Sequence, residues 1–155
     1  MQVYTDVDDT LVANSPFRML EYIERYTDQV RVRDSWKFNK ALLASKRCQW
    51  THSPLFSRLF NEKSKITLVT GRPSSLNLTT HRWWVENGFK GAPEIINTEF
   101  RSPEQYIADR KVVIDAIPYG SVYIDDNVYL FNYAAGRGLK AILIKDGIVA
   151  DISFP

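Results

Sequence analysis

A cluster of carboxylates, Asp-Val-Asp-Asp-Thr, follows a short apolar segment near the start of the chain. Asp6 and Asp8 alternate along the chain, so both side chains can reach one pocket where a strand ends. Two carboxylates that lie close together repel each other and need a cation or a shared proton. A hard divalent ion such as Mg²⁺ suits them and also neutralises phosphate oxygens. One carboxylate can then attack phosphorus while the other transfers protons. The alternative is an acidic turn without chemistry.

A second motif, Thr-Gly-Arg, comprises Thr70, Gly71 and Arg72 and follows another apolar run. A hydroxyl at a strand end, a glycine turn and the start of a helix together form a small phosphate site. Arg72 can add a bidentate contact to a phosphate. The alternative is a plain junction between a strand and a helix, with a surface arginine.

A third motif again places paired carboxylates, Asp125 and Asp126, after an apolar run. Two separate predicted strands thus end in paired carboxylates. Lys111 lies earlier, in the middle of a helical segment, where its charge can offset the carboxylates and hold a phosphoryl group. The alternative for Lys111 is an ordinary surface lysine.

These motifs require a sheet whose strands end at one edge. Short apolar runs rich in β-branched residues predict parallel strands, and helical patterns lie between them. The strands are expected at residues 3–5, 66–69, 94–96, 122–124 and 141–144, and the helices at residues 73–87, 102–117 and 127–137. This alternation predicts an α/β fold, a Rossmann-like three-layer sandwich with a mainly parallel sheet.

Residues 14–63 separate the first two strands by more than one crossover helix needs, and we interpret them as a helical, cap-like insertion. Apolar residues suggest helices around residues 17–24, 38–42 and 54–60. Residues 13–65 contain 11 Lys/Arg and 5 Asp/Glu, which favours an anionic partner or indicates a solvated helical face. Trp36 and Trp50 lie among these basic residues and can either stack on bases or form the core of the insertion.

Length and composition indicate a single domain, residues 1–155. Cys48 is the only cysteine, which excludes an intrachain disulfide and a cysteine-based zinc site. The chain shows neither a signal peptide nor an apolar run long enough to cross a membrane, so we expect a cytoplasmic protein without a membrane partner. The sequence leaves the oligomeric state open.

The order and spacing of the three motifs resemble the haloacid dehalogenase superfamily of phosphotransferases. Asp6 to Thr10 match its Asp-x-Asp-x-Thr motif, Thr70 matches its hydroxyl residue, and Lys111 matches its lysine. Asp125 and Asp126 match its acidic pair. The resemblance covers most of the chain outside residues 14–63.

The resemblance implies roles for these residues. Asp6 would be the nucleophile and a metal ligand. Asp8 would protonate the leaving group and then activate water, with its backbone carbonyl on the metal. Thr70 and Lys111 would bind the phosphoryl group, and Asp126, with or without Asp125, would complete the magnesium site. An acid at position 8 favours phosphate-ester hydrolysis over dehalogenation.

Thr-Gly-Arg, a helix with His81 to Glu86, and Ile-Asp-Asp-Asn also look like the phosphatase half of phage polynucleotide kinase-phosphatases. That resemblance implies removal of a 3′-phosphate from a nucleic-acid end. We therefore expect a Mg²⁺-dependent phosphomonoesterase that acts on a nucleotide or a nucleic-acid end. The alternatives are a phosphatase of a small metabolite, such as a sugar phosphate, and a non-catalytic nucleic-acid-binding module on the same fold.

Overall fold

The computed structural model describes residues 1–18, 36–98 and 102–155. Within these residues the strands form one six-stranded sheet in the order β3-β2-β1-β4-β5-β6, and every neighbouring pair is parallel except β5 and β6. The strands are β1 (Gln2–Thr5), β2 (Lys65–Thr70), β3 (Glu94–Asn97), β4 (Val122–Asp125), β5 (Lys140–Lys145) and β6 (Ile148–Ser153). The chain is thus α/β with a mainly parallel sheet, which is compatible with the predicted Rossmann-like fold.

Helices lie between the strands. They are α2 (Trp36–Leu43), α3 (Pro54–Leu59), α4 (Asn77–Glu86), α5 (Pro103–Asp115) and α6 (Val128–Gly136), with short 3₁₀ turns η2 (Gln49–His52) and η3 (Ser74–Leu76). Side-chain caps mark the start of three of these helices, α3, α5 and α6. The Ser102 hydroxyl accepts a hydrogen bond from the Gln105 amide at 3.1 Å, and the Asn127 side chain accepts one from the Leu130 amide at 3.0 Å. Across the described ranges, no helix combines the length and apolarity needed to cross a bilayer.

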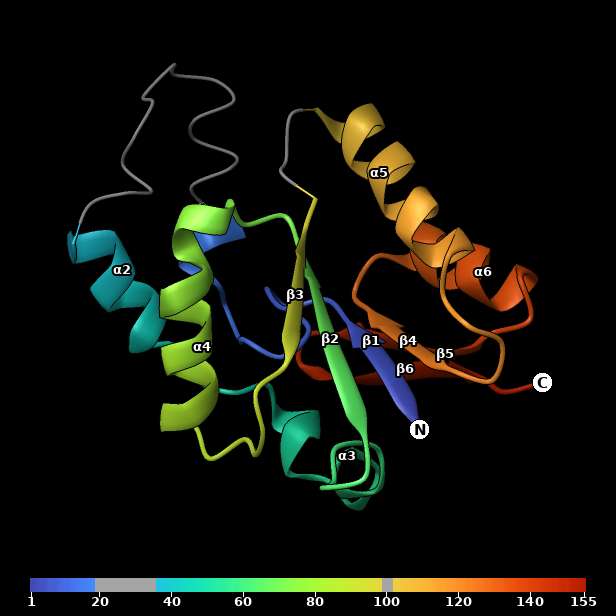
Figure 1. Ribbon diagram of the computed structural model, residues 1–155, viewed down its shortest axis with the longest axis horizontal. Coiled ribbons are helices and arrows are strands. Elements are labelled where there is room, and N and C mark those ends of the chain that lie inside the picture. The colour runs from blue at the N-terminus through green and yellow to red at the C-terminus, as the bar shows by residue number, and fades with distance from the viewer. Residues whose placement is uncertain (19–35, 99–101) are drawn as a thin grey trace.

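The sheet is buried on both faces because its strands alternate between two apolar clusters. Val122 and Ile124 of β4 pack with Trp83 and Trp84 of α4, whereas Tyr123 faces the cluster that contains α5 and α6. Figure 1 shows α4 on one side of the central strands and α5 and α6 on the other. The carboxyl ends of β1 and β4 therefore lie where the helices divide between the two faces, the place where open α/β sheets form a crevice.

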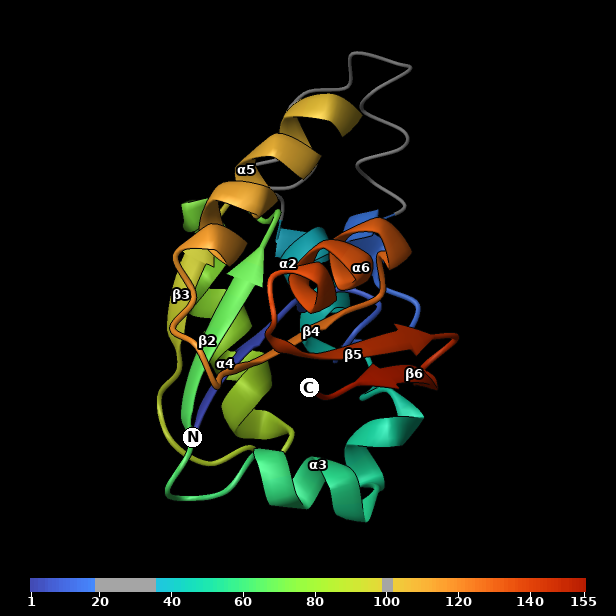
Figure 2. The ribbon, with the colours of Figure 1, turned by 90° about the vertical axis from the view of Figure 1, so that its right-hand side faces the viewer.

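The five strands predicted from apolar runs are confirmed, and the structure adds a sixth that was not predicted. β6 follows β5 through a tight turn at Asp146 and Gly147, whose φ angles are 52° and 77°. An Asp-Gly pair is a strong signal for this kind of hairpin. A search for apolar runs misses β6 because it is an edge strand with mostly exposed or half-buried side chains (Figure 2).

The predicted insertion is described only in part. The helix expected at residues 17–24 lies largely outside the described residues, and the helices expected around residues 38–42 and 54–60 match α2 and α3. A single cap-like unit over residues 14–63 therefore stays a prediction. Trp50 and Phe56 belong to the apolar cluster beneath the sheet, whereas Trp36 is 69% exposed. Stacking of Trp50 on a base is thus excluded by its burial.

Trp50 also connects the first carboxylate motif to the rest of the fold. Its indole Nε1 donates a hydrogen bond of 2.7 Å to the Thr10 carbonyl, and its amide donates one of 2.9 Å to the Gly147 carbonyl. Trp50 is 3% exposed. The indole bond thus satisfies a buried carbonyl in the turn that carries Asp6 and Asp8.

We predict that Trp50→Phe lowers the free energy of unfolding by about 1–3 kcal/mol, because it leaves the Thr10 carbonyl without its donor. Urea denaturation followed by circular dichroism measures the change. Trp36→Phe is the matched control, and it should shift stability by less than about 0.5 kcal/mol because Trp36 is exposed. Equal effects of the two substitutions would contradict this role of Trp50.

Candidate active site

The carboxylates of the first and third motifs meet at the carboxyl ends of β1 and β4. Asp6 directly follows β1, and its amide donates a hydrogen bond of 2.9 Å to the Ile124 carbonyl of β4. Asp125 is the last residue of β4, and Asp126 follows it. Asp6 and Asp125 are buried, and Asp126 is partly exposed. Parallel pairing of two strands that end together thus brings these acids to one point.

A tight turn after β1 places Thr10 between two of the acids. The Val7 carbonyl accepts hydrogen bonds from the Thr10 and Leu11 amides at 3.3 and 2.8 Å. Asp9 provides the left-handed residue of this turn, with a φ of 63°. The Thr10 hydroxyl then lies 3.0 Å from Asp6 Oδ2 and 3.2 Å from Asp126 Oδ1. These two carboxylate oxygens therefore face each other.

Among the described residues, Asp6, Asp125 and Asp126 form a group that can hold a metal ion. Each offers one carboxylate oxygen, and the three oxygens lie within 4.8 Å of one another. Oxygen ligands from carboxylates are those that hard cations such as Mg²⁺ prefer. The donor set therefore fits the predicted cofactor. The Asp8 side chain does not belong to this group.

Burial and repulsion within the group separate the pKa values of its members. Burial and the neighbouring Asp6 raise the pKa of Asp126 to about 9. Burial and the charge of Asp6 also raise the pKa of Asp125. For Asp6, burial acts in the same direction, but Arg110 and Arg18 outweigh it and hold its pKa well below the usual range. Asp6 is thus the member kept as a carboxylate, which a nucleophile requires.

Arg110, and not the predicted Lys111, supplies the buried cation of α5. Its Nη2 lies 2.9 Å from Asp6 Oδ1, and its Nη1 lies 3.4 Å from Asp125 Oδ2. Its Nε donates a hydrogen bond of 3.0 Å to the Thr98 hydroxyl. Lys111 lies on the outer side of α5, with its Nζ 4.8 Å from the ring centroid of Tyr129. The position of Lys111 does not support the predicted contact with a phosphoryl group.

The helical periodicity of α5 could have identified Arg110. The buried residues of this helix are Tyr106, Arg110 and Ile114, which follow one another at intervals of four. Lys111 is rotated by about 100° from Arg110 around the helix axis. An arginine in register with an apolar stripe is buried and needs acidic partners, which Asp6 and Asp125 provide.

Asp8 lies apart from the metal-binding group, in a buried ion pair with Arg72. Nε of Arg72 is 3.0 Å from Asp8 Oδ2, and Nη2 is 2.6 Å from Asp8 Oδ1. Nη1 of Arg72 donates to the Thr80 hydroxyl at 3.1 Å, and the Ser15 hydroxyl donates to Asp8. Arg72 was predicted to bind phosphate, and in the structure its guanidinium instead contacts Asp8 and Thr80, an arrangement that orients Asp8.

Thr70 and Gly71 lie beside this pair at the end of β2. Thr70 is buried, and its hydroxyl accepts a hydrogen bond of 3.1 Å from the Arg72 amide. Gly71 lines the small cavity in front of Asp6. Gly71 of the second motif thus lies at the cavity in front of Asp6, and the side chain of Arg72 points to Asp8. The predicted phosphate-binding role of Thr70 and Gly71 stays a prediction.

Arg18 closes the site from the solvent side, and the sequence did not single it out. Its Nη2 lies 3.1 Å from Asp6 Oδ2, 3.1 Å from Asp126 Oδ1 and 3.4 Å from the Asp8 carbonyl oxygen. A cavity of about 10 Å³ remains between Arg18, Arg110 and the acids. This is no more than the roughly 10–15 Å³ that one water molecule requires. A phosphoryl group therefore needs a side chain to move before it can enter.

We predict that Arg110→Met lowers the free energy of unfolding by about 3–5 kcal/mol, because it leaves Asp6 and Asp125 without their buried counter-charge. Lys111→Met is the neighbouring control, and it should change stability by less than about 0.5 kcal/mol. Chemical denaturation of both variants without added metal checks the pair. A larger loss in Lys111→Met than in Arg110→Met would restore Lys111 as the cation of the site.

Searches against protein-family models, curated proteins and solved structures found no match to this chain. The resemblance to the haloacid dehalogenase superfamily thus rests on the motif residues themselves.

Proposed function

We propose that the chain is a Mg²⁺-dependent phosphomonoesterase of the haloacid dehalogenase type, with Asp6 as the nucleophile. The observation that carries the proposal is the setting of Asp6. Its carboxylate is buried at a strand end, Arg110 contacts one oxygen at 2.9 Å, and the other oxygen faces Asp126. A carboxylate held ionised in this way, at the crevice of a parallel sheet, suits attack on phosphorus.

The proposed reaction has two steps. In the first, a carboxylate oxygen of Asp6 bonds to phosphorus while the bond from phosphorus to the ester oxygen breaks. The leaving oxygen takes a proton from Asp8, which carries that proton in place of its ion pair with Arg72 while the substrate is bound. In the second, Asp8 takes a proton from water, the water oxygen attacks phosphorus, and the Asp6 carboxylate is released with inorganic phosphate. Arg72 and Ser15 donate hydrogen bonds to Asp8 in the structure. For each proton transfer, Asp8 must therefore give up one of these contacts and contact the leaving oxygen or the water instead.

The negative charge of the transferring phosphoryl group would be offset by the metal ion and by groups of the chain. Mg²⁺, held by Asp6 with Asp125 and Asp126, would neutralise the phosphate oxygens as a Lewis acid. Arg110 stays beside Asp6 and can stabilise the charge that develops on the transferring group. Gly71 lines the cavity in front of Asp6, and Thr70 precedes it at the end of β2, so these two residues would bind a phosphoryl oxygen. Lys111 has no part in this proposal.

A nucleic-acid end carrying a 3′-phosphate is the substrate class that we propose. α2 buries Phe38 and Leu42 against Phe17, which lines the cavity in front of Asp6. The outer side of α2 carries the exposed Trp36, with Lys40 Nζ 5.7 Å from its ring centroid. An exposed aromatic ring among cations suits single-stranded nucleic acid.

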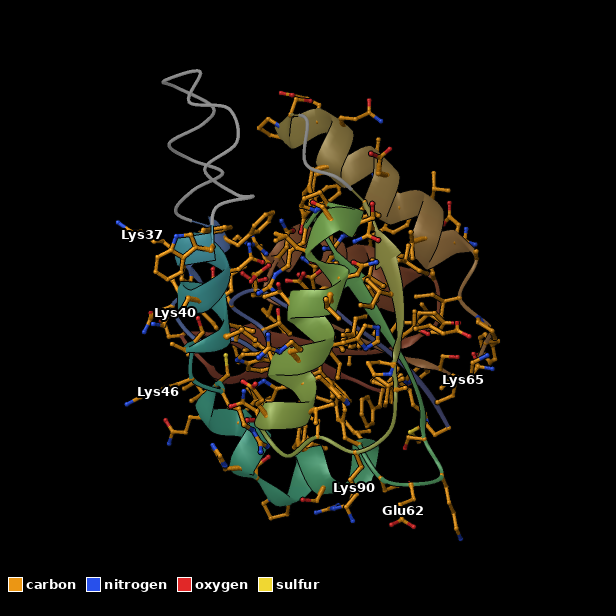
Figure 3. All side chains as sticks on the ribbon, turned by 60° about the vertical axis from the view of Figure 1, so that its left-hand side comes forward. Lys37, Lys40, Lys46, Glu62, Lys65 and Lys90 are labelled. Carbon is orange, nitrogen blue, oxygen red and sulfur yellow. The ribbon has the colours of Figure 1, made fainter. Side chains whose placement is uncertain are left out.

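Figure 3 supports this substrate class, because Lys37, Lys40 and Lys46 lie along one flank of the molecule on and after α2. The labelled Lys65 and Lys90 lie on a different part of the surface. Each of these two has an acidic partner, Glu94 at 3.9 Å and Glu62 at 3.5 Å. The flank formed by α2 is thus the better site for an anionic polymer.

We predict that Asp6→Asn abolishes Mg²⁺-dependent release of phosphate from p-nitrophenyl phosphate, with a loss on the order of 10³-fold or more, as expected for a nucleophile. EDTA should stop the wild-type reaction and added Mg²⁺ should restore it. Asp151→Asn is the control, since Asp151 is an exposed carboxylate on β6, and it should keep full activity. Wild-type rates in Asp6→Asn would end the proposed mechanism.

We predict that Lys37→Gln combined with Lys40→Gln raises KM for a 3′-phosphorylated oligonucleotide and leaves turnover of p-nitrophenyl phosphate unchanged. The slope of log affinity against log salt should fall by roughly 0.7 for each phosphate that the lysines no longer neutralise. Lys65→Gln combined with Lys90→Gln is the charge-matched control and should behave like the wild type.

The same assay separates the alternatives. Higher efficiency on mononucleotides or sugar phosphates than on the oligonucleotide would favour a small-metabolite phosphatase. Salt-sensitive oligonucleotide binding without turnover under any divalent metal would favour a non-catalytic binding module.

A further inference from the structure

One nitrogen of Arg18 contacts three oxygens that belong to three different residues. Nη2 lies 3.1 Å from Asp6 Oδ2, 3.1 Å from Asp126 Oδ1 and 3.4 Å from the backbone carbonyl oxygen of Asp8. Two carboxylate oxygens and a carbonyl oxygen that converge on one point are the ligand types of a hard divalent cation. The Arg18 guanidinium therefore lies where these three oxygens could bind a cation.

A divalent ion and the Arg18 guanidinium cannot both use this point. Mg²⁺ binds its oxygen ligands at about 2.0–2.1 Å. An ion bound to the three oxygens that Nη2 contacts would therefore lie close to Nη2. Two cations at such a distance repel each other strongly in a site that excludes water. The Thr10 hydroxyl also lies within 3.2 Å of both carboxylate oxygens, so the space around them is already filled by groups of the chain.

The charge balance of the site favours an exchange of the two cations. In the described part of the chain, four carboxylates (Asp6, Asp8, Asp125, Asp126) face three guanidinium groups (Arg18, Arg72, Arg110). Carboxylates bind a metal in their deprotonated form, and with all four of them ionised one negative charge is left over. Replacing Arg18 by a divalent ion makes the cluster neutral and frees one positive charge for an arriving phosphate.

Arg18 is also the arginine of the three that can leave. Its side chain is 31% exposed, whereas those of Arg72 and Arg110 are each 1% exposed. Departure of Arg18 would also open the cavity of about 10 Å³ that it lines together with Asp6 and Phe17. Metal entry and access for a phosphoryl group thus depend on the same movement.

We propose that Arg18 is a built-in competitor of the divalent metal: its guanidinium closes the metal-free site and must leave Asp6 and Asp126 before a metal ion binds there. The proposal rests on the metal site of the proposed function, and it adds a control on when that site opens. With Arg18 in place, the site is closed to anionic ligands until a metal ion has displaced the guanidinium.

Titration of the full chain with Mn²⁺ alone, followed by electron paramagnetic resonance of the free ion, tests the competition without any substrate. Arg18→Gln should lower the Kd for Mn²⁺ by about five- to a hundredfold, the usual range for coupling between two ligands. Arg18→Lys keeps a cation and should stay closer to the wild type than to Arg18→Gln. Arg82→Gln, at an exposed arginine on α4, is the control.

A second measurement does not depend on the resonance signal. Without metal, Arg18→Gln should melt at a lower temperature than the wild type because Asp6 and Asp126 lose a partner. The rise in Tm caused by a fixed Mg²⁺ concentration should then be larger in Arg18→Gln, since tighter binding stabilises the folded state more.

An unchanged or higher Kd in Arg18→Gln would overturn the competition. Equally tight binding in Arg18→Lys and Arg18→Gln would also overturn it, because charge would then not be the cause. Turnover of p-nitrophenyl phosphate, measured in parallel, separates the two proposals. Tighter Mn²⁺ binding in Arg18→Gln without any turnover would support Arg18 as the competitor and contradict the proposed phosphatase activity. Turnover with an unchanged Kd would support the phosphatase activity and contradict the competition.

Discussion

The repulsion between carboxylates gathered at the ends of β1 and β4 constrains the rest of the site. Parallel pairing of the two strands brings Asp6 to Asp125 and Asp126 at a point from which water is largely excluded. Such a group is unstable unless each charge is offset by a cation, a proton or a hydrogen-bond donor. Arg110 from α5 and the Thr10 hydroxyl from the turn meet this requirement. Their contacts with Asp6 thus connect elements that are far apart in the chain.

The apolar core stabilises this arrangement because it fixes the elements that carry the charges. Trp83 and Trp84 seal one face of the sheet, and Tyr106 and Ile114 place the buried side of α5 against the other. With α5 fixed, the Arg110 guanidinium needs little further ordering to reach its partners. Preorganised charges of this kind are those that contribute most to stabilising a transition state.

Much of the fold and part of the site could be predicted from the sequence. Apolar runs ending in Asp6 and Asp125 reveal both the strands and the acids, because strand burial and strand ends are local properties. The partners of those acids are not local. The pair of Asp8 with Arg72 depends on where β1 and β2 lie in the sheet, and the choice of Arg110 over Lys111 depends on which side of α5 faces the core.

The buried pair of Asp8 and Arg72 has a consequence for how such a sequence can diverge. Loss of either partner alone would leave a single charge in the interior, with a penalty that exceeds the loss of most surface contacts. The two positions are therefore expected to covary among any relatives of this chain: a relative that keeps Asp8 should keep Arg72, and one that has lost Asp8 should have lost Arg72. Lys111, which is half-buried on the outer side of α5 against Tyr129, has no charged partner in the interior, and its position is expected to vary more freely.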